Sequence, residues 1–267
     1  MTSAATSLPD ERQERIRQEL SRRGRVLAVD LARQYGVSDD TIRRDLRELA
    51  ASGLCRRVYG GALSLAPATP PIDQRIADQP LRKSALGACG ARLIAETCRK
   101  GGVLFLDGGS TNLAIARALP AGLDLTVVTN APAIAAALMT LPDIRLVVIG
   151  GRIDPRLGAA LGARALRDLG AIRLDMAFLG TCALDPEGGI TATDFEDAEL
   201  KHAVVEMASM IATAVTNDKL GTSAPFEVGP ASLLTHLVVE ADAAEPALAP
   251  FRELGTAVRM AEPALSR

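Results

Sequence analysis

Aromatic residues, histidines and paired cysteines are scarce in this sequence of 267 residues. Tryptophan is absent and aromatic residues make up 3% of the chain, which excludes base stacking on aromatic side chains as the main way of holding nucleic acid. The four cysteines form no CxxC pair and there are only two histidines. This argues against a zinc finger and against a Cys–His nucleophile pair. We therefore expect reduced thiols, no metal and no cofactor.

Long apolar runs are missing as well. The richest stretch, residues 131–141, is interrupted by Pro132 and is shorter than the roughly 18 residues that a membrane helix needs. The N-terminus has no cationic segment followed by an apolar core, so it does not match a secretory signal. We expect a cytoplasmic protein with no membrane partner.

Charge is distributed unevenly along the chain. The net charge is -2, but residues 1–65 contain 12 arginines, no lysine and 9 acidic residues, a local balance of +3. The length favours two domains, since one domain takes about 150 residues. We predict a DNA-binding head at 1–62, a linker at 63–80 that begins with an uncharged stretch rich in Pro and Ala, and a sensing body at 81–267. A basic head on an acidic body indicates a nucleic-acid partner.

The head has the pattern of a helix-turn-helix. Its apolar spacing predicts helices over 11–20, 31–35 and 39–52. Asp30 and Ser38 are suited to cap the second and third helices, because short polar side chains accept from free backbone N–H groups at a helix start. A short turn containing glycine joins these two helices, as in helix-turn-helix domains.

The third predicted helix has one apolar and one polar side. Ile42, Leu46 and Leu49 form a narrow stripe that must pack against the first two helices. Asp45 lies beside this stripe, so we expect it to anchor an arginine or a helix end rather than to contact DNA. The polar side can enter the major groove of DNA. The residues expected to contact DNA from this helix and its cap are Ser38, Asp40, Thr41, Arg43, Arg44 and Arg47.

Residues 54–62 predict a two-stranded wing. Arg56 and Arg57 can reach phosphates, and Gly60 and Gly61 allow close backbone approach. Arginine suits bidentate contacts with phosphate, although a solvated charged surface is the ordinary alternative for such a run.

The body alternates between apolar runs and helical patterns. Such alternation predicts an α/β domain with a mostly parallel sheet. The predicted strands lie at 103–106, 125–129, 145–149, 176–179, 211–215 and 237–239, and the predicted helices at 112–119 and 133–139.

A glycine-rich loop follows the first predicted strand of the body. Gly108 and Gly109 let the backbone approach an anion, and Ser110 and Thr111 can donate hydrogen bonds to it. Asp107 accepts hydrogen bonds and suits sugar hydroxyls. A plain turn followed by a helix cap is the alternative.

Small polar residues also follow the other strands, where ligands bind in parallel sheets. Together with acidic and basic side chains further along the chain, they could bind a phosphorylated polyol. These further candidates are Thr129, Asn130, Gly150, Gly151, Gly180, Asp194, Glu199, Lys201 and Lys219.

The run Ser38-x-x-Thr41-Ile42-Arg43-Arg44-Asp45-Leu46, with Gly60-Gly61-Ala62, resembles the head of DeoR-family bacterial transcription regulators. The resemblance continues through the body. It implies a fold similar to ribose-5-phosphate isomerase and CoA transferases, a phosphorylated sugar as effector, and a homodimer or higher homo-oligomer.

Several family motifs can be placed on the body. The family's D-x-G-[ST]-T loop falls on 107–111, its T-N on 129–130, its G-G on 150–151, its E-x-x-x-K-like segment on 197–201 and its S-K-F-G on 218–221. In the last motif Asp218 replaces serine. Lys219 could therefore bind the ligand or pair with Asp218.

The resemblance and the residues together predict a DNA-binding regulator, a repressor in most such cases, of a carbohydrate operon. A phosphorylated sugar would control its affinity for operator DNA. One alternative is an enzyme like a sugar-phosphate isomerase with an attached head, since Asp107 and the lysines could transfer protons. A constitutive architectural DNA-binding protein is a third possibility, but it leaves the ligand-type loop without a role.

Overall fold

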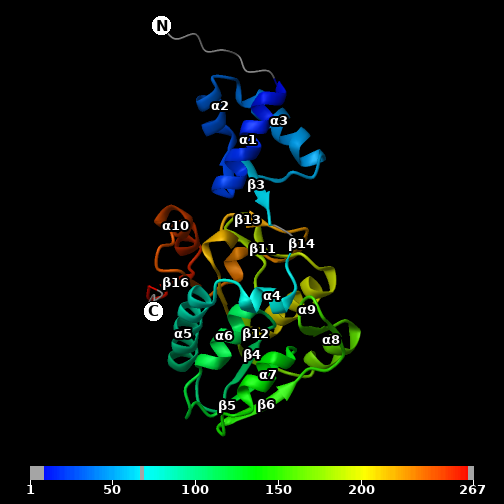
Figure 1. Cartoon of the computed structure of the whole chain (residues 1–267), viewed down its shortest axis with the longest axis vertical. Coiled ribbons are helices and arrows are strands. Elements are labelled where there is room, and N and C mark those ends of the chain that lie inside the picture. Colours follow the sequence, from blue (N-terminus) through cyan, green and yellow to red (C-terminus); the bar gives the residue numbers. More distant parts are fainter. Residues whose placement is uncertain (1–8, 67–68, 264–267) are drawn as a thin grey trace.

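The computed structural model describes residues 9–66 and 69–263, with a small helical head above a larger body (Figure 1). Residues 1–8 of the expected head, 67–68 of the expected linker and 264–267 of the expected body lie outside the described residues. The start of the chain, where no secretory signal was expected, is among them. Within the described part of the chain, no helix has both the length and the apolar character needed to cross a membrane.

Three helices form the head: α1 (Pro9–Arg23), α2 (Ala28–Tyr35) and α3 (Asp39–Ala51). The expected apolar stripe of α3 is buried against α1, whose Ile16 and Leu20 are also in the core of the head. The prediction for α2 was wrong at its start. Strand β1 (Arg25–Leu27) leads directly into the helix, so Leu27 is the N-cap and Asp30 lies in the first turn.

A buried ion pair joins α1 to α3. Arg12 Nε donates to Asp45 Oδ2 at 2.5 Å and Arg12 Nη2 donates to Asp45 Oδ1 at 3.0 Å. The two side chains are 4% and 1% exposed. The prediction that Asp45 anchors an arginine is therefore confirmed, and this pair fixes the position of α3 on α1.

The predicted wing is present as β2 (Cys55–Val58) and β3 (Gly61–Leu65), which pair antiparallel. Strand β3 also pairs with β1. Gly61 lies so close to β1 that an added Cβ would be 2.0 Å from the carbonyl oxygen of Val26. Glycine is required there by packing inside the head.

A seven-stranded sheet forms the centre of the body, and all its strand pairs are parallel. The mostly parallel α/β sheet predicted from the sequence is confirmed. In spatial order its strands are β16 (Ala257–Met260), β15 (His236–Val239), β12 (Ala208–Ala214), β9 (Leu174–Leu179), β4 (Val103–Leu106), β5 (Leu125–Thr129) and β6 (Ile144–Val148).

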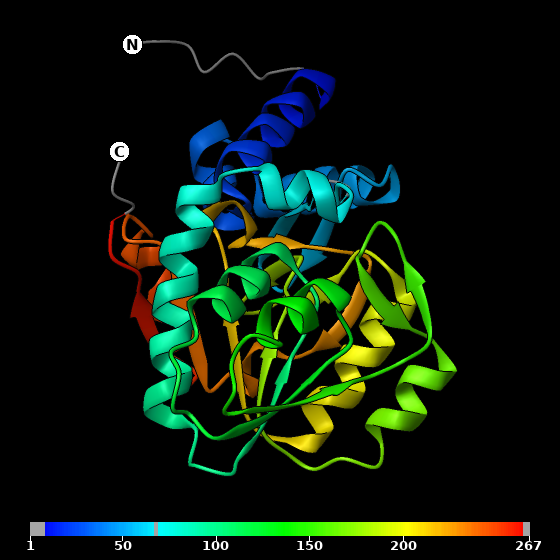
Figure 2. The ribbon, with the colours of Figure 1, turned by 60° about the horizontal axis from the view of Figure 1, so that its bottom comes forward.

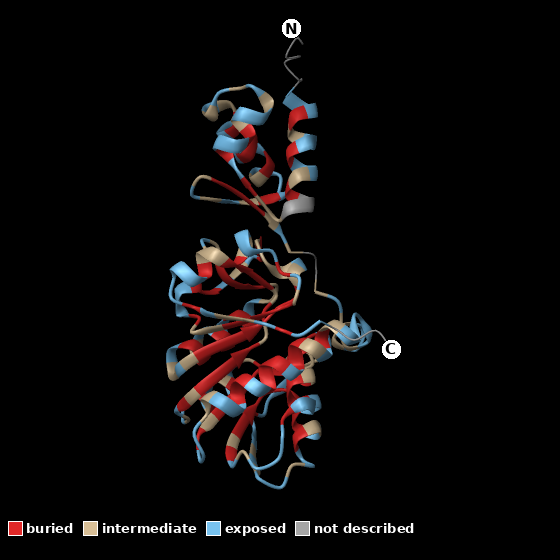
Figure 3. Cartoon of the chain, turned by 90° about the vertical axis from the view of Figure 1, so that its left-hand side faces the viewer, coloured by how far each residue is buried: buried red, intermediate tan, exposed pale blue. Residues whose placement is uncertain are grey.

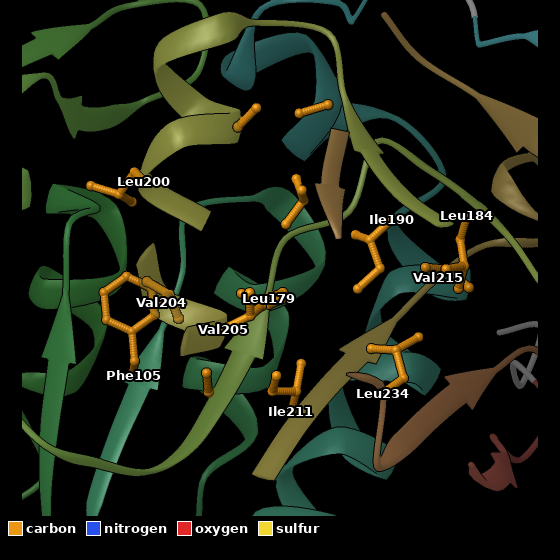
Figure 4. Close-up of a cluster of buried hydrophobic side chains, with 14 of the residues drawn as sticks. Phe105, Leu179, Leu184, Ile190, Leu200, Val204, Val205, Ile211, Val215 and Leu234 are labelled. Atoms are coloured by element: carbon orange, nitrogen blue, oxygen red, sulfur yellow. The ribbon is translucent and has the colours of Figure 1, made fainter. Parts of the chain in front are cut away.

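Helices cover both faces of this sheet (Figure 2). On one face lie α5 (Pro80–Thr97), α6 (Ser110–Ala118) and α7 (Pro132–Leu138); on the other lie α8 (Ala163–Leu169), α9 (Phe195–Met207) and α10 (Glu245–Glu253). Successive strand residues alternate between the two cores, as a pleated strand requires. Leu104 and Leu106 pack with α5 and α6, while Phe105 packs with α9 near Val204 (Figure 4).

Smaller strands surround the sheet. A hairpin is formed by β7 (Arg152–Asp154) and β8 (Ala159–Leu161), and a three-stranded sheet by β10 (Ala183–Asp185), β11 (Gly189–Ala192) and β14 (Phe226–Gly229). Two short 3-10 helices, η1 (Asn217–Lys219) and η2 (Ala231–Leu233), complete the body.

Residues 63–80, expected as a spacer, contain more structure than the composition suggested. They include the end of β3, helix α4 (Ile72–Ala77) and the first residue of α5. The end of β3 pairs in parallel with the body strand β13 (Thr222–Ser223).

Head and body also meet backbone to backbone beside that pair. An added Cβ on Gly24 of the head would lie 2.9 Å from the carbonyl oxygen of Gly221 in the body. Each part nevertheless keeps its own group of buried residues (Figure 3).

Candidate functional site

The start of α3 is built as the sequence predicted. Ser38 is the N-cap, and its Oγ accepts from the backbone N–H of Thr41 at 3.2 Å. The hydroxyls of Ser38 and Thr41 are also hydrogen-bonded to each other at 2.8 Å. Asp40 is exposed next to them. The N-terminal end of α3 is therefore rigid and solvent-facing.

The exposed arginines of α3 differ in their freedom. Arg43 Nε pairs with Asp39 at 2.6 Å, one turn earlier on the same helix. Arg44 and Arg47 are exposed, and no ion pair is recorded for either of them among residues 9–66 and 69–263. These two guanidinium groups are the ones on α3 that are available to an external anion.

The two wing arginines point to different partners. Arg57 is exposed, as expected for a residue that contacts DNA. Arg56 turns towards the body, where its Nη1 donates to Ser223 Oγ at 2.9 Å. Arg56 and Gly61 were predicted to contact DNA, but the structure uses Arg56 between head and body and buries Gly61. Gly60, at the tip of the wing, remains accessible.

A cavity of about 450 Å³ opens at the carboxyl ends of β4 and β9. From these adjacent strands the chain continues in opposite directions, towards β5 and β6 on one side and β12 and β15 on the other. Ligands bind at such switch points in parallel α/β sheets. Of the predicted effector residues, the cavity wall contains Gly108, Gly109, Ser110, Thr111, Gly180, Lys201 and Lys219.

The predicted glycine-rich loop forms the start of α6. Gly109 is the N-cap and supplies no capping side chain, so the first N–H groups of this helix are not satisfied by a cap. Free N–H groups at a helix N-terminus attract anions. Asn112 Nδ2 donates to the carbonyl oxygens of Asp107 and Phe178 at 2.9 and 3.1 Å, which holds the ends of β4 and β9 together.

Asp107 lies behind this loop and supports it. Its carboxylate accepts from the backbone N–H groups of Gly108 and Gly180 at 2.7 and 2.9 Å. Lys201 Nζ lies 3.6 Å from Asp107 Oδ2 and donates to Asp197. Burial raises the pKa of Asp107 to about 6, although Lys201 lowers it. Burial also lowers the pKa of Lys201, but the two carboxylates outweigh it and keep that pKa above its ordinary value.

Two other cations of the cavity have no carboxylate beside them. Lys219 Nζ donates to the carbonyl oxygen of Thr181 at 2.6 Å, and none of the ion pairs recorded among the described residues joins it to Asp218. Arg75, from α4, donates only to carbonyl oxygens, and burial lowers the pKa of both groups. The cavity therefore presents two buried positive charges that are not neutralised locally.

Some predicted residues support the cavity from outside its wall. Asn130 Oδ1 accepts from Gly108 N at 3.1 Å, and Thr129 Oγ1 accepts from Ala131 N at 3.2 Å. Asp194 caps α9 by accepting from Asp197 N. Gly150 and Gly151 follow β6 and are absent from the wall.

Glu199 was expected in the site, but it lies on the exposed side of α9. Asp197 and Lys201 are four residues apart and share one side of the helix, whereas residue 199 lies on the opposite side. Asp197 occupies the position that the prediction gave to Glu199.

Sequence reasoning missed several residues of the wall. Arg75 and Lys83 come from the region assigned to the spacer and the following helix, and their charges after a Pro-rich stretch were the available signal. Thr181 and Cys182 directly follow the predicted Gly180, and Thr216 follows β12. No group of three or more His, Cys, Asp or Glu in the described part of the chain is placed to hold a metal ion.

Comparison with solved structures gives two examples of similar architecture. A sor operon regulator from Shigella flexneri is 14% identical, with a TM-score of 0.42 over 64% of this chain and 90% of that chain. Ribose 5-phosphate isomerase A from Methanocaldococcus jannaschii is 17% identical, with a TM-score of 0.37 over 53% of this chain and 54% of that chain.

Comparison with protein families is more informative. Residues 12–68 match the model of the DeoR-like helix-turn-helix domain, and residues 89–241 match that of the DeoR C terminal sensor domain. The glycerol-3-phosphate regulon repressor of Escherichia coli K12 is 32% identical over 83% of this chain and 87% of that protein. These relatives are regulators and not enzymes, which confirms that expectation. The chain thus belongs to the DeoR family of transcriptional regulators.

Proposed function

We propose that the chain represses genes of carbohydrate metabolism and that a phosphorylated sugar or polyol, bound in the cavity, releases it from operator DNA. The observation that carries this proposal is the pair of locally unneutralised cations, Arg75 and Lys219, in one wall with the uncapped start of α6. Cations and helix N–H groups together suit a phosphate. The name of the glycerol-3-phosphate regulon repressor is in keeping with this class of effector.

The proposed division of labour follows the charge distribution. Residues 1–62 read DNA, residues 63–80 connect, and residues 81–267 sense the effector and assemble the homo-oligomer. On the DNA side Ser38, Asp40 and Thr41 lie at the start of α3, with Arg43, Arg44 and Arg47 along it and Arg57 and Gly60 in the wing. The ordered start of α3 and the two unpaired guanidinium groups support this assignment. A dimer would present two heads to half-sites about one helical turn, or a multiple of it, apart.

On the effector side, the loop 108–111 and Lys219 would hold the phosphate. Asp197, held by Lys201, would accept from sugar hydroxyls. The effector must bind one arrangement of the heads more tightly than the other, because only differential affinity shifts an equilibrium. A coupling of about 1–3 kcal/mol would change the affinity for DNA roughly 5- to 150-fold.

A thermal-shift screen of the full chain tests this proposal. The probes are inorganic phosphate, phosphorylated sugars and polyols, and the same compounds without phosphate. A ligand at 100 times its Kd should raise the free energy of unfolding by about 2.7 kcal/mol, and it should weaken binding to DNA sites selected from a random library. The proposal is refuted if no phosphorylated compound both stabilises the protein and changes its affinity for DNA.

A charge variant locates the response. Ser110→Asp adds a carboxylate at the start of α6 and should abolish stabilisation by phosphorylated ligands while leaving DNA binding intact. Thr140→Asp adds the same charge at an exposed position after α7 and should respond normally. A normal response of the Ser110→Asp variant would exclude this loop as the phosphate site.

A further inference from the structure

The segment that connects head and body also forms one wall of the cavity. Thr69, Gln74, Arg75 and Gln79 line it from this segment, and the loop after β4 and residues after β9 line it from the body. Helix α4 lies at the upper edge of the body in Figure 1, on the side that faces the head. A molecule that fills the cavity therefore contacts the connection between the two parts of the chain.

Arg75 is held in this wall by neutral partners. Its Nε donates to the carbonyl oxygen of Pro70 at 2.9 Å, and its Nη2 donates to those of Arg156 and Leu157 at 3.3 Å each. Hydrogen bonds between guanidinium and phosphate are charge-assisted and shorter than such bonds to carbonyls. A phosphate group within reach would therefore compete with these carbonyl groups for Arg75.

The cavity also borders the strand pair that joins head to body. On the head strand β3, the next residue is Ala66, which lines the cavity and donates its N–H to Ser223 O at 2.7 Å. On the body side, Lys219 lines the cavity, and its carbonyl oxygen accepts from Thr222 Oγ1 at 2.8 Å. Both strands of the β3–β13 pair are thus anchored at cavity residues.

The same strand pair contacts the wing. Ser223 of β13 accepts from Arg56 of β2 at 2.9 Å, and Ser64 of β3 lies opposite Thr222 in the register. A displacement of either cavity residue must therefore act on a pair that holds the wing against the body. The distance along the chain is short on both sides, one residue from β3 to Ala66 and three from Lys219 to Thr222.

We propose that Arg75 of the connecting segment binds the phosphate group of the effector together with Lys219 of the body, and that this bridge controls the β3–β13 pair and so the position of the wing. The inference rests on the proposed function and adds to it the residue that makes the connection a part of the binding site. A ligand that bridges two segments has different contacts when they move apart, which gives it the differential affinity that regulation requires.

The first experiment measures ligand binding to Arg75→Gln. Glutamine can still donate to the Pro70 carbonyl, but it carries no charge. The probes are inorganic phosphate, glycerol 3-phosphate, ribose 5-phosphate and fructose 6-phosphate. For the probe that stabilises the wild type, we expect the Kd of the variant to rise roughly 10- to 100-fold, as is typical when a hydrogen bond to a charged group is lost. Arg167→Ala removes an exposed arginine of α8 and should leave the Kd unchanged.

The second experiment locks the strand pair. Ser64 and Thr222 are register partners, so the double variant Ser64→Cys, Thr222→Cys can form a disulfide across it. We expect the oxidised protein to bind the probe with an affinity within about threefold of the wild type, while its affinity for DNA changes less than twofold on adding the probe. Reduction should restore the response.

The outcomes separate the two proposals. If no probe stabilises the wild type or changes its affinity for DNA, the proposed function fails and this inference fails with it. If the wild type responds but Arg75→Gln binds the probe like the wild type, or the oxidised double variant responds in full, only the inference is overturned.

Discussion

Replacing Lys201 with methionine should strongly destabilise the body. The ammonium group of Lys201 is 5% exposed and lies between Asp197 and Asp107, whose side chains are 5% and 1% exposed. The variant leaves two buried carboxyl groups without a cation. Because breaking a buried ion pair in this way costs about 3–5 kcal/mol, we expect the free energy of unfolding to fall by that amount at pH 8.

Urea denaturation followed by circular dichroism measures this change. In a domain of this size, each kcal/mol corresponds to about 2–4 °C in Tm, so the Tm should fall by roughly 6–20 °C. Lys100→Met removes an exposed lysine of the same body and should change the free energy of unfolding by less than about 0.5 kcal/mol.

The pH dependence tests the reason for the loss. The destabilisation by Lys201→Met should be smaller at pH 5 than at pH 8, since the Asp107 carboxyl, with a pKa of about 6 already in the wild type, can then take up a proton. A loss below about 1 kcal/mol at pH 8 would refute the reasoning, because it would mean that Lys201 contributes no net stabilisation to the two carboxylates.

Three other outcomes are expected. Arg44→Ala should weaken binding to a selected DNA site by about 1–3 kcal/mol if this arginine reads a base; unchanged fluorescence anisotropy titrations would exclude that role. The wild type has a stabilising contribution from Asp107 that is complete below about pH 4 and is lost as the pH rises through 6. Asp107→Asn should remove that pH dependence from urea unfolding curves, and an unaltered profile would contradict the raised pKa. Gly61→Ala should destabilise the head by about 1–3 kcal/mol through overpacking against Val26, and wild-type stability would show that β1 and β3 can separate.

The sequence predicted the central strands well because their signal is local. Residues 103–106 and 125–129 are apolar runs ended by polar or small residues, and they coincide with β4 and β5. Helix α5 was not predicted. Gly87 and Gly90 weaken its helical signal, and the reason for these glycines is tertiary. An added Cβ on either would lie 2.7 Å from an atom of α6, so close packing between the helices replaces local propensity.

The candidate site was predictable where it follows strand ends, and less so elsewhere. The loop 108–111 was found because a glycine-rich turn after a buried strand is a local pattern. Arg75 was missed because its place in the wall depends on how residues 69–79 fold back over the body. Arg56 was assigned to DNA because two adjacent arginines look alike in a sequence, whereas successive strand residues point to opposite sides and only Arg57 is exposed.

The close approach of Gly24 to Gly221 limits how freely heads and bodies can be exchanged between regulators. The two residues belong to different parts of the chain, yet any side chain at position 24 would collide with the backbone at 221. A chimera with another protein's head must therefore keep glycine at this point, or its seam will open. DNA-reading residues on α3 can vary without this restriction, so new operators can evolve by changes on the outer surface while the seam is inherited unchanged.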